Sequence, residues 1–266
     1  MSLLKDKKDF ILTGLLVLMI LGSVWSIIQM RSLTAEMRSS LNKRPEGQMQ
    51  YSALETSDPL YFEKHVARED SARFANANLQ SVASFVDRNA LLDFGVGQAK
   101  GSGLFCEFGV FTGATINFIA SHTKAQVHGF DSFEGLPEKW REGFDKGAFQ
   151  MDGLPRVREN VVLHKGWFDQ SVPVFATKYR ENIAFMHMDA DLYSSTKTVF
   201  DLLGNRIVSG TVIIFDEFLN YPGWQNGEFK AFQELVQQRH LKFEYIGRVP
   251  NGGQMAIKIT GIRSTE

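Results

Sequence analysis

The chain has 266 residues, 44% of them hydrophobic, and a formal net charge of -1 at pH 7. This length is enough for a well-buried domain with a short appendage. The near-neutral charge, with no run of arginine and lysine interleaved with aromatic residues, argues against nucleic acid as a partner. Cys106 is the single cysteine, which excludes an intrachain disulfide and a zinc site built from cysteines, and we expect it to be a small core residue.

The N-terminal region contains a long apolar segment. Residues Phe10 to Met30 carry no charge and are bounded by Asp9 and Arg31. A helix of this length spans a hydrocarbon core of about 30 Å. A cleaved signal peptide is the alternative, but the segment is long for one and no Ala-x-Ala-like site follows. We therefore predict a short tail at residues 1–9 and a transmembrane anchor at residues 10–30.

A polar linker and a folded domain are expected after the anchor. Residues 31–59 carry Pro45, Gly47 and many polar side chains, which is typical of a tether or a juxtamembrane helix. Residues 60–266 are expected to form the domain. Its first part, Tyr61 to Leu92, has apolar residues at helical intervals, which predicts helices that cap a sheet.

From Gly103 onward, apolar strands alternate with amphipathic segments. This alternation predicts an α/β fold, with a parallel sheet covered by helices on both faces. Two further strands near the C-terminus are joined by a connection so short that they must form an antiparallel hairpin. Parallel strands followed by such a hairpin are the arrangement of Rossmann-like methyltransferases. The predicted strands are Leu104 to Gly109, Gln126 to Phe130, Val161 to His164, Ile183 to Met188, Thr211 to Phe215, Lys242 to Gly247 and Gln254 to Ile259.

The first parallel strand ends in a glycine-bearing turn, Cys106-Glu-Phe-Gly-Val-Phe-Thr-Gly113. Glycines at this turn of an open α/β sheet let the backbone approach a nucleotide-like ligand. The spacing departs from the pyrophosphate fingerprint Gly-x-Gly-x-x-Gly, because Glu107 stands where its first glycine would be. A carboxylate there suits a ligand with positive charge and no phosphate, such as S-adenosylmethionine. Glu107, Gly109 and Gly113 are therefore predicted to contact this cofactor.

The next two strand ends carry further cofactor candidates. Asp131 is placed to accept hydrogen bonds from both ribose hydroxyls, and Ser132 and Phe133 lie in the same turn, with Phe133 or Phe130 available to pack on adenine. The alternative is that Asp131 only caps that turn. Gly166 and Trp167 follow the third strand, where Trp167 either walls the adenine or sulfonium or serves plain packing.

Acidic residues follow the fourth and fifth strands. The first and fourth strands flank the topological switch point, so Asp189, Asp216 and Glu217 are expected to converge beside the donor methyl group. Converging carboxylates are costly unless a cation or a proton neutralises them, and oxygen ligands suit Mg²⁺, Mn²⁺ or Ca²⁺. These three acids are therefore the predicted metal ligands, and Asp189 also counts as a catalytic and a cofactor-binding candidate.

A proton acceptor is expected close to the same acids. Asp191 is the candidate general base, and His187 is a poorer one because it lies inside an apolar strand. The alternative for the acidic residues as a group is that some only cap helices or pair with Lys197 and Arg206.

Five motifs between about Leu60 and Ile259 resemble, in order, those of the macrocin and mycinamicin sugar O-methyltransferase family. They are Cys-Glu-Phe-Gly-Val-Phe-Thr-Gly, Gly-Phe-Asp-Ser-Phe-Glu-Gly-Leu-Pro, His-Lys-Gly-Trp-Phe, Met-Asp-Ala-Asp-Leu-Tyr-Ser-Ser-Thr and Ile-Ile-Phe-Asp-Glu-Phe. The resemblance implies S-adenosylmethionine, Mg²⁺ and a hydroxyl acceptor on a sugar. It places Asp189, Asp216 and Glu217 on the metal acids, although Glu217 has a longer arm than the aspartate expected there.

The chain also departs from related enzymes. Leu192 replaces the lysine base of the catechol-type methyltransferases, so their mechanism does not transfer. The predicted anchor is absent from the soluble tailoring enzymes, and it suggests an acceptor at the membrane, such as a lipid-linked or surface glycan. Membrane recruitment alone accounts for an anchor equally well. Because the donor is cytosolic, we expect a single-pass membrane protein with its catalytic domain in the cytoplasm.

The sequence thus predicts an S-adenosylmethionine-dependent O-methyltransferase that acts, with a divalent cation, on a hydroxyl of a small molecule or glycan. The segments Trp140 to Pro155 and Leu219 to Gly227 are the expected acceptor-facing lids. Two alternatives stay open: a metal-independent small-molecule methyltransferase and a noncatalytic scaffold protein that binds S-adenosylmethionine.

Overall fold

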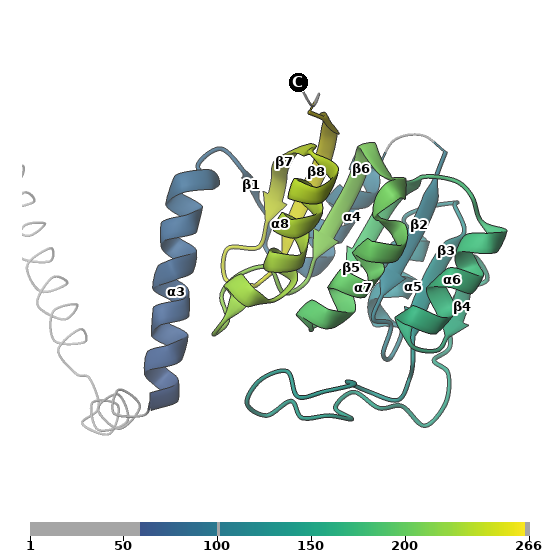
Figure 1. Ribbon diagram of the computed structural model, residues 1–266, viewed down its shortest axis with the longest axis horizontal. Coiled ribbons are helices and arrows are strands. Elements are labelled where there is room, and N and C mark those ends of the chain that lie inside the picture. Colours follow the sequence, from purple (N-terminus) through teal and green to yellow (C-terminus); the bar gives the residue numbers. More distant parts are fainter. Residues whose placement is uncertain (1–58, 100–101, 264–266) are drawn as a thin grey trace, which may run out of the picture. The chain divides into compact units, whose positions relative to one another are not determined.

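The computed structural model describes residues 59–99 and 102–263, and the chain from Phe62 onward forms one compact unit (Figure 1). The predicted tail, the predicted anchor at residues 10–30 and all but the last residue of the predicted linker lie outside the described residues. Among the helices that are described, none has both the length and the apolar character needed to cross a bilayer.

An eight-stranded mixed sheet forms the centre of this unit, in the order β1-β7-β8-β6-β5-β2-β3-β4. Strands β6, β5, β2, β3 and β4, which are neighbours in this order, run parallel to one another. Strand β8 is antiparallel to both β6 and β7. The parallel sheet and the C-terminal hairpin that the sequence predicts are thus confirmed. The strands are β1 (Ala83–Ser84), β2 (Leu104–Phe108), β3 (Val127–Asp131), β4 (Val161–Lys165), β5 (Ile183–Met188), β6 (Ile207–Phe215), β7 (Leu241–Arg248) and β8 (Met255–Ile262).

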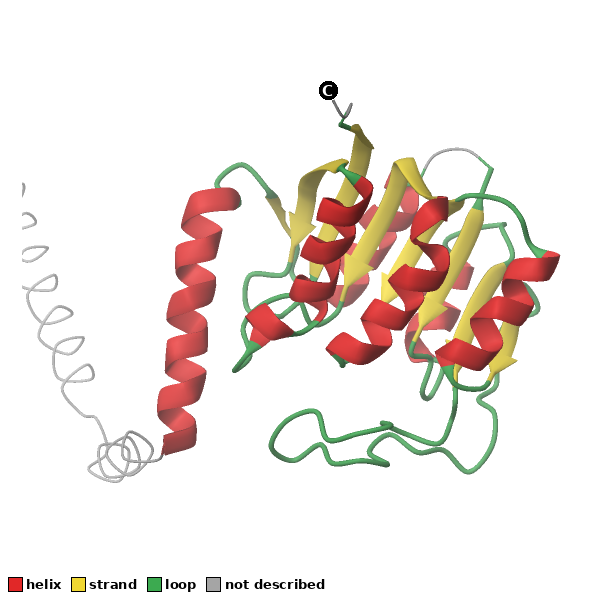
Figure 2. Cartoon of the chain, viewed as in Figure 1, coloured by secondary structure: helices red, strands yellow, loops and turns green. Residues whose placement is uncertain are grey.

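Helices cover both faces of the sheet, as predicted (Figures 1 and 2). One face carries α4 (Arg88–Gln98) and α5 (Ala114–Ser121), and the other carries α6 (Phe168–Lys178), α7 (Tyr193–Leu203) and α8 (Glu228–Arg239). Every residue of β2 and β5 is buried, because a parallel strand between two helical layers has no solvent-facing side. Cys106 of β2 is one of these buried residues.

Two elements flank this core. Helix α3 (Pro59–Asn78) packs the ring of Phe74 edge-on against Trp224, Phe229 and Tyr245, with ring centres 5.6, 5.5 and 5.8 Å apart. Strand β1, which the sequence does not predict, is only two residues long and pairs in parallel with β7 at the edge of the sheet. Two short 3-10 turns, η1 (Gly204–Arg206) and η2 (Trp224–Asn226), complete the described elements.

The start of α4 is fixed by a side-chain cap. The carboxylate of Asp87 accepts a hydrogen bond of 2.8 Å from the N–H of Ala90, an N-cap that fixes where the helix begins. Arg88 is therefore the first helical residue, and its guanidinium reaches the carboxyl ends of the central strands.

Candidate active site

Backbone hydrogen bonds join the loops that follow the central strands. The N–H groups of Gly109, Asp189 and Asp216 donate to the carbonyls of Phe130, Phe108 and Met188 at 3.0, 2.9 and 2.9 Å. Each bond holds the residue after one strand against one of the last two residues of its neighbour. The glycine turn and the two acid-bearing loops are therefore held at one edge of the sheet, where open α/β folds bind ligands.

Gly109 is required by a close backbone approach. Its φ is +92°, and a Cβ atom there would lie 1.8 Å from the carbonyl oxygen of Asp189. Only glycine fits, so this position brings the turn after β2 against the loop after β5. Gly113, also with a positive φ of +81°, is the N-cap of α5.

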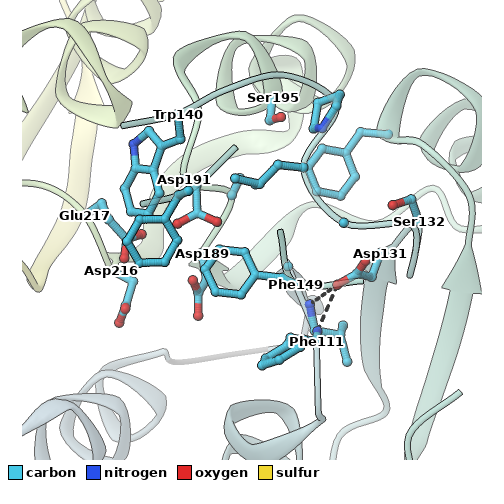
Figure 3. A pocket seen from close by; sticks show the side chains of 18 of the residues that line it. Phe111, Asp131, Ser132, Trp140, Phe149, Asp189, Asp191, Ser195, Asp216 and Glu217 are labelled. Atoms are coloured by element: carbon cyan, nitrogen blue, oxygen red, sulfur yellow. Dashed lines mark hydrogen bonds between the residues drawn. The ribbon is translucent and has the colours of Figure 1, made fainter. Parts of the chain in front are cut away.

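The carboxylate of Asp131 organises the turn after β2. Its Oδ2 accepts hydrogen bonds of 2.8 Å from the N–H groups of Val110 and Phe111 (Figure 3). Its Oδ1 accepts one of 2.7 Å from the N–H of Phe133. Asp131 thus caps its own turn, the structural alternative raised by the sequence, and it also lines the cavity described next. The two roles coexist because a carboxylate offers about four acceptor positions.

A cavity of about 710 Å³ opens at this edge of the sheet. Ligand pockets in proteins typically measure about 300–1,000 Å³, so it is large enough for a cofactor with an acceptor beside it. Figure 3 shows Asp131 and Ser132 on one side, and Asp189, Asp191, Asp216 and Glu217 gathered on the other. Of the residues predicted from the sequence, the cavity wall includes Gly109, Asp131, Ser132, Trp167, Asp189, Asp191, Asp216 and Glu217.

Five other predicted residues are not on this wall: Glu107, Gly113, Phe133, Gly166 and His187. Glu107 and His187 are fully buried behind it, and Nδ1 of His187 lies 2.9 Å from Oε2 of Glu107. Thr115 donates to the other oxygen of Glu107 at 3.2 Å. Glu107 therefore contacts a histidine rather than the cavity.

The charge of His187 also bears on its predicted role. Burial lowers the pKa of His187, but the carboxylates of Asp216 and Glu107 outweigh burial and raise it to about 10. The contact with Asp216 is electrostatic, because Nε2 lies 3.9 Å from Oδ1, beyond hydrogen-bond distance. A raised pKa disfavours His187 as a base at neutral pH.

The four acids of the cavity and the buried His187 form two overlapping groups of three residues, which share Asp189. Oxygen atoms of Asp189, Asp191 and Glu217 lie within 4.8 Å of one another, and so do single ligand atoms of His187, Asp189 and Asp216. The sequence places Asp216 with Asp189 and Glu217, whereas the structure brings Asp191 into that position. Asp191 has a positive φ of 60°, an uncommon backbone state that turns the loop after β5 sharply.

Arg88, which sequence reasoning missed, partly balances these acids. Its Nη1 lies 3.2 Å from Asp216 Oδ2 and 3.6 Å from Asp189 Oδ2. Burial raises the pKa of Asp216, but His187 and Arg88 outweigh burial and bring it below its ordinary value. A lone arginine far upstream gives no sequence signal of this pairing.

Asp189, Asp191 and Glu217 are balanced less fully than Asp216. Burial and the charge of Asp216 raise the pKa of Asp189, and burial and the charge of Asp189 raise that of Glu217. Burial, offset in part by Arg141, raises the pKa of Asp191 to about 7. Oε2 of Glu217 is buried and has no hydrogen-bond partner among the described residues. Such a cluster binds a proton or a cation readily.

Glu228, also missed, holds the two acid-bearing loops together. This fully buried carboxylate accepts hydrogen bonds of 3.2 Å from the N–H groups of Ala190 and Glu217. The first N–H lies between Asp189 and Asp191, and the second belongs to the loop after β6. One side chain at the start of α8 therefore fixes the spacing of the acids.

Aromatic residues and an arginine close the cavity from the loop after β3. The guanidinium of Arg141 lies 3.8 Å from the ring centre of Trp140 and 5.0 Å from that of Phe144. Trp140, Arg141, Phe144 and Phe149 all line the cavity, as expected of the lid predicted at Trp140 to Pro155. From the second predicted lid, Tyr221 contacts Trp140, with ring centres 6.0 Å apart.

Comparisons with known proteins agree with this geometry. Residues 106–218 match a family model described as a methyltransferase domain. The calicheamicin methyltransferase CalS11 aligns with a TM-score of 0.54 and 21% identity, over 82% of this chain and 94% of that one. A second structure of CalS11, named there a TDP-rhamnose 3'-O-methyltransferase, aligns with a TM-score of 0.47 and 20% identity over 82% and 96% of the two chains. The O-methyltransferase NovP aligns with a TM-score of 0.49 and 20% identity, over 65% and 79%.

Among curated proteins, none matches the sequence. The family match covers the strand ends from the glycine turn to the loop after β6, and the CalS11 alignment extends the shared fold over most of the domain. The motif resemblance seen in the sequence is thereby confirmed at the level of the methyltransferase domain. The chain therefore carries a methyltransferase domain over residues 106–218, within a fold that it shares with CalS11.

Proposed function

We propose that this enzyme transfers a methyl group from S-adenosylmethionine to a hydroxyl of a sugar or glycan-like acceptor, with help from a divalent cation. The observation that carries the proposal is the single cavity that joins a turn suited to the donor with a cluster of four carboxylates.

The donor half of the cavity consists of the turn after β2 and the start of the loop after β3. Asp131 faces the cavity while bonded to that turn, so a ribose on its free lone pairs would lie beside Gly109 and Val110. Trp167 and Phe168 line the same cavity and supply apolar surface for an adenine ring.

The acid cluster fits a hard divalent cation. Asp189, Asp191 and Glu217 offer oxygens close to one another, and Glu217 Oε2 lacks a partner among the described residues. We propose these three as the residues that hold Mg²⁺, with Asp216 paired to Arg88. A bound cation would lower the pKa of the acceptor hydroxyl and stabilise the alkoxide. If no cation binds, Asp191 is the candidate base within the cavity.

A sugar acceptor is supported by the lid and by the relatives. The rings of Trp140, Phe144 and Phe149 give flat apolar surface on which a sugar ring can stack, beside the guanidinium of Arg141. The motifs resemble those of sugar O-methyltransferases, and CalS11, which shares the fold, is named for a sugar substrate.

A membrane location remains part of the proposal. The uncharged run from Phe10 to Met30 supports a single-pass anchor with the catalytic domain in the cytoplasm. The full-length protein should sediment with membranes and resist carbonate extraction. Recovery of a native form that lacks about the first 25 residues would support a cleaved signal instead.

The test of the metal-assisted reaction uses a chelator and two matched variants. Chelator should abolish methyl transfer, and Mg²⁺ should restore it. Asp189→Asn should lose turnover but keep most of its affinity for S-adenosylmethionine, because the donor is held mainly by the turn after β2. Glu217→Asp, which keeps the carboxylate on a shorter arm, should retain activity. Full activity in excess chelator would favour a metal-independent methyltransferase, and absence of any turnover would favour a noncatalytic scaffold.

The acceptor can be found by comparing metabolites of wild-type and deletion cells. A methyl group missing from glycans of the deletion strain would identify the acceptor class. Methyl loss confined to other small molecules would contradict the sugar assignment.

A further inference from the structure

A second cavity of about 750 Å³ lies outside the active site described above. Its walls come from α3, from the loop after β6 and from the turn between β7 and β8. Among the residues that line it are Arg68, Ser71, Asn76, Asn220, Arg248, Asn251 and Gln254. None of them lines the active-site cavity.

The charge of this cavity is opposite to that of the active site. Arg68 and Arg248 are the charged residues on its wall, and no aspartate or glutamate is among the described residues that line it. Neither guanidinium has an ion-pair partner among the described residues. Two unneutralised positive charges in one concave site attract an anion of about two negative charges, which suits a phosphate better than a single carboxylate.

Arg248 supplies a second and independent indication of a ligand. Its Nε is buried and has no hydrogen-bond partner among the described residues. A buried donor without a partner destabilises the folded state, and a bound oxyanion would satisfy it. Arginine is suited to this task because its planar fork donates two parallel hydrogen bonds to a phosphate.

The floor of the cavity is held in place by hydrogen bonds. The N–H of Asn220 donates to Oγ of Ser71 at 3.0 Å, and that hydroxyl donates to the carbonyl of Ala67 at 2.7 Å. The side-chain amide of Asn220 donates to the carbonyl of Gly252. The loop after β6 is therefore tied to α3 and to the hairpin turn, and the site is preformed.

Uncharged side-chain amides on the wall can donate and accept hydrogen bonds to the part of a ligand that carries no charge. The side chains of Asn76 and Asn251 line the cavity and make no hydrogen bond to a described residue. Gln254 also lines it and donates to Oδ1 of Asp216 at 3.2 Å, so one side chain separates this cavity from the acid cluster.

We propose that this cavity binds a phosphate-bearing small molecule, with its phosphate between Arg68 and Arg248 and its uncharged polar groups on the amides. The proposal does not depend on the acceptor or the metal of the methyl-transfer reaction.

The experiment is calorimetric titration of the full-length chain with inorganic pyrophosphate, phosphate and citrate, at constant ionic strength and without divalent metal. Pyrophosphate should bind saturably at one site per chain, more tightly than citrate. Saturating S-adenosylhomocysteine should leave this binding unchanged, because it occupies the other cavity.

Variants locate the site. Arg248→Gln and Arg68→Gln should each weaken pyrophosphate binding about tenfold or more, the usual cost of losing a charge-assisted hydrogen bond. Arg180→Gln, an exposed arginine outside both cavities, should bind as the wild type does. Arg68 lies on the exposed surface of α3, so its replacement should not disturb the fold. If Arg248→Gln melts at a lower temperature than the wild type, the affinity of Arg68→Gln for pyrophosphate is the test of the site.

Three results would overturn the proposal. They are no saturable binding, equal binding by wild type and both variants, and displacement of pyrophosphate by S-adenosylhomocysteine. Tighter binding of citrate than of pyrophosphate would overturn the assignment to phosphate.

Discussion

Nη1 of Arg88 lies 3.2 Å from Oδ2 of Asp216, although 128 residues separate them in the sequence. This contact places a permanent positive charge at the edge of the acid cluster proposed to hold a divalent cation. The same Nη1 lies 3.6 Å from Oδ2 of Asp189, which is one of the proposed ligands, so the positive charge of Arg88 opposes the binding of another cation.

Removing the charge of Arg88 should tighten cation binding. Arg88→Gln should raise Mn²⁺ affinity about threefold or more, since two positive charges several ångströms apart repel by about 1 kcal/mol even when water screens them. Calorimetry on the variant measures this directly. Arg73→Gln is the control, because Arg73 pairs with Asp70 on the surface of α3. Weaker Mn²⁺ binding by Arg88→Gln would indicate that Arg88 organises the cluster instead.

The sheet was predictable because its strands are buried on both faces and read as continuous apolar runs, as in Ile183–Met188. The meeting of the loops at its carboxyl edge was predictable as well, because parallel strands bring their carboxyl ends together. Asp131, Asp189, Asp191, Asp216 and Glu217 consequently share one cavity.

Side-chain partners could not be predicted from the same pattern. Glu107 precedes the glycine turn, but strand alternation alone does not say that its partner is His187 on the next strand. Arg88 and Glu228 each start a helix, and their roles depend on where that helix meets the sheet edge. Strand β1 is too short to leave an alternation signal.

Glu228 should control the spacing of the two acid-bearing loops. Glu228→Gln keeps the size but replaces one acceptor oxygen with a donor, so either Ala190 or Glu217 loses its partner. We expect the free energy of unfolding to fall by about 1–3 kcal/mol and Mn²⁺ affinity to fall as well. Urea unfolding and calorimetry measure the two effects.

Glu234→Gln is the matched control on the same helix. Glu234 pairs with Lys230 near the surface, so its loss should change stability by less than about 1 kcal/mol and leave Mn²⁺ binding unaltered. Equal effects of the two variants would argue against a positioning role for Glu228.

Asp131 is expected to bind the donor ribose as well as its own turn. Asp131→Ala should weaken S-adenosylhomocysteine binding at least about tenfold, given about 1.5–3 kcal/mol for a charge-assisted hydrogen bond. Because the same change frees the N–H groups of Val110 and Phe111, affinity alone does not separate the two roles.

A 2'-deoxy analogue of S-adenosylhomocysteine separates them. The wild type should bind the analogue less tightly than the parent compound. Asp131→Ala should bind the analogue and the parent compound equally well. If the analogue loses the same affinity with both proteins, Asp131 does not contact that hydroxyl.

His128 should make the domain less stable in acid. Burial, together with the charges of His164 and Lys178, lowers its pKa to about 4, whereas Glu181 opposes the shift. Below its unfolded pKa of about 6.5, the unfolded chain binds a proton that the folded chain does not. Above about pH 6.5, His128 is neutral in both states and does not lower the free energy of unfolding. As the pH drops to 4, its titration lowers that free energy by up to about 3 kcal/mol.

Comparison of variants isolates the contribution of His128. The pH profile of unfolding for His128→Gln should be flatter than that of wild type between about pH 6.5 and 4. His240→Asn, at an exposed left-handed position, should retain the wild-type slope. A variant profile parallel to wild type would show that His128 titrates normally.

Asp189, Asp191 and Glu217 are proposed to hold a divalent cation beside the donor methyl group. Paramagnetic relaxation of bound S-adenosylmethionine by Mn²⁺ tests it directly and requires no acceptor. We expect Mn²⁺ to broaden the methyl protons of the donor more strongly than its adenine protons, and Asp189→Asn to remove the effect. Methyl relaxation that Mn²⁺ leaves unchanged, in a protein that binds the donor, would contradict it.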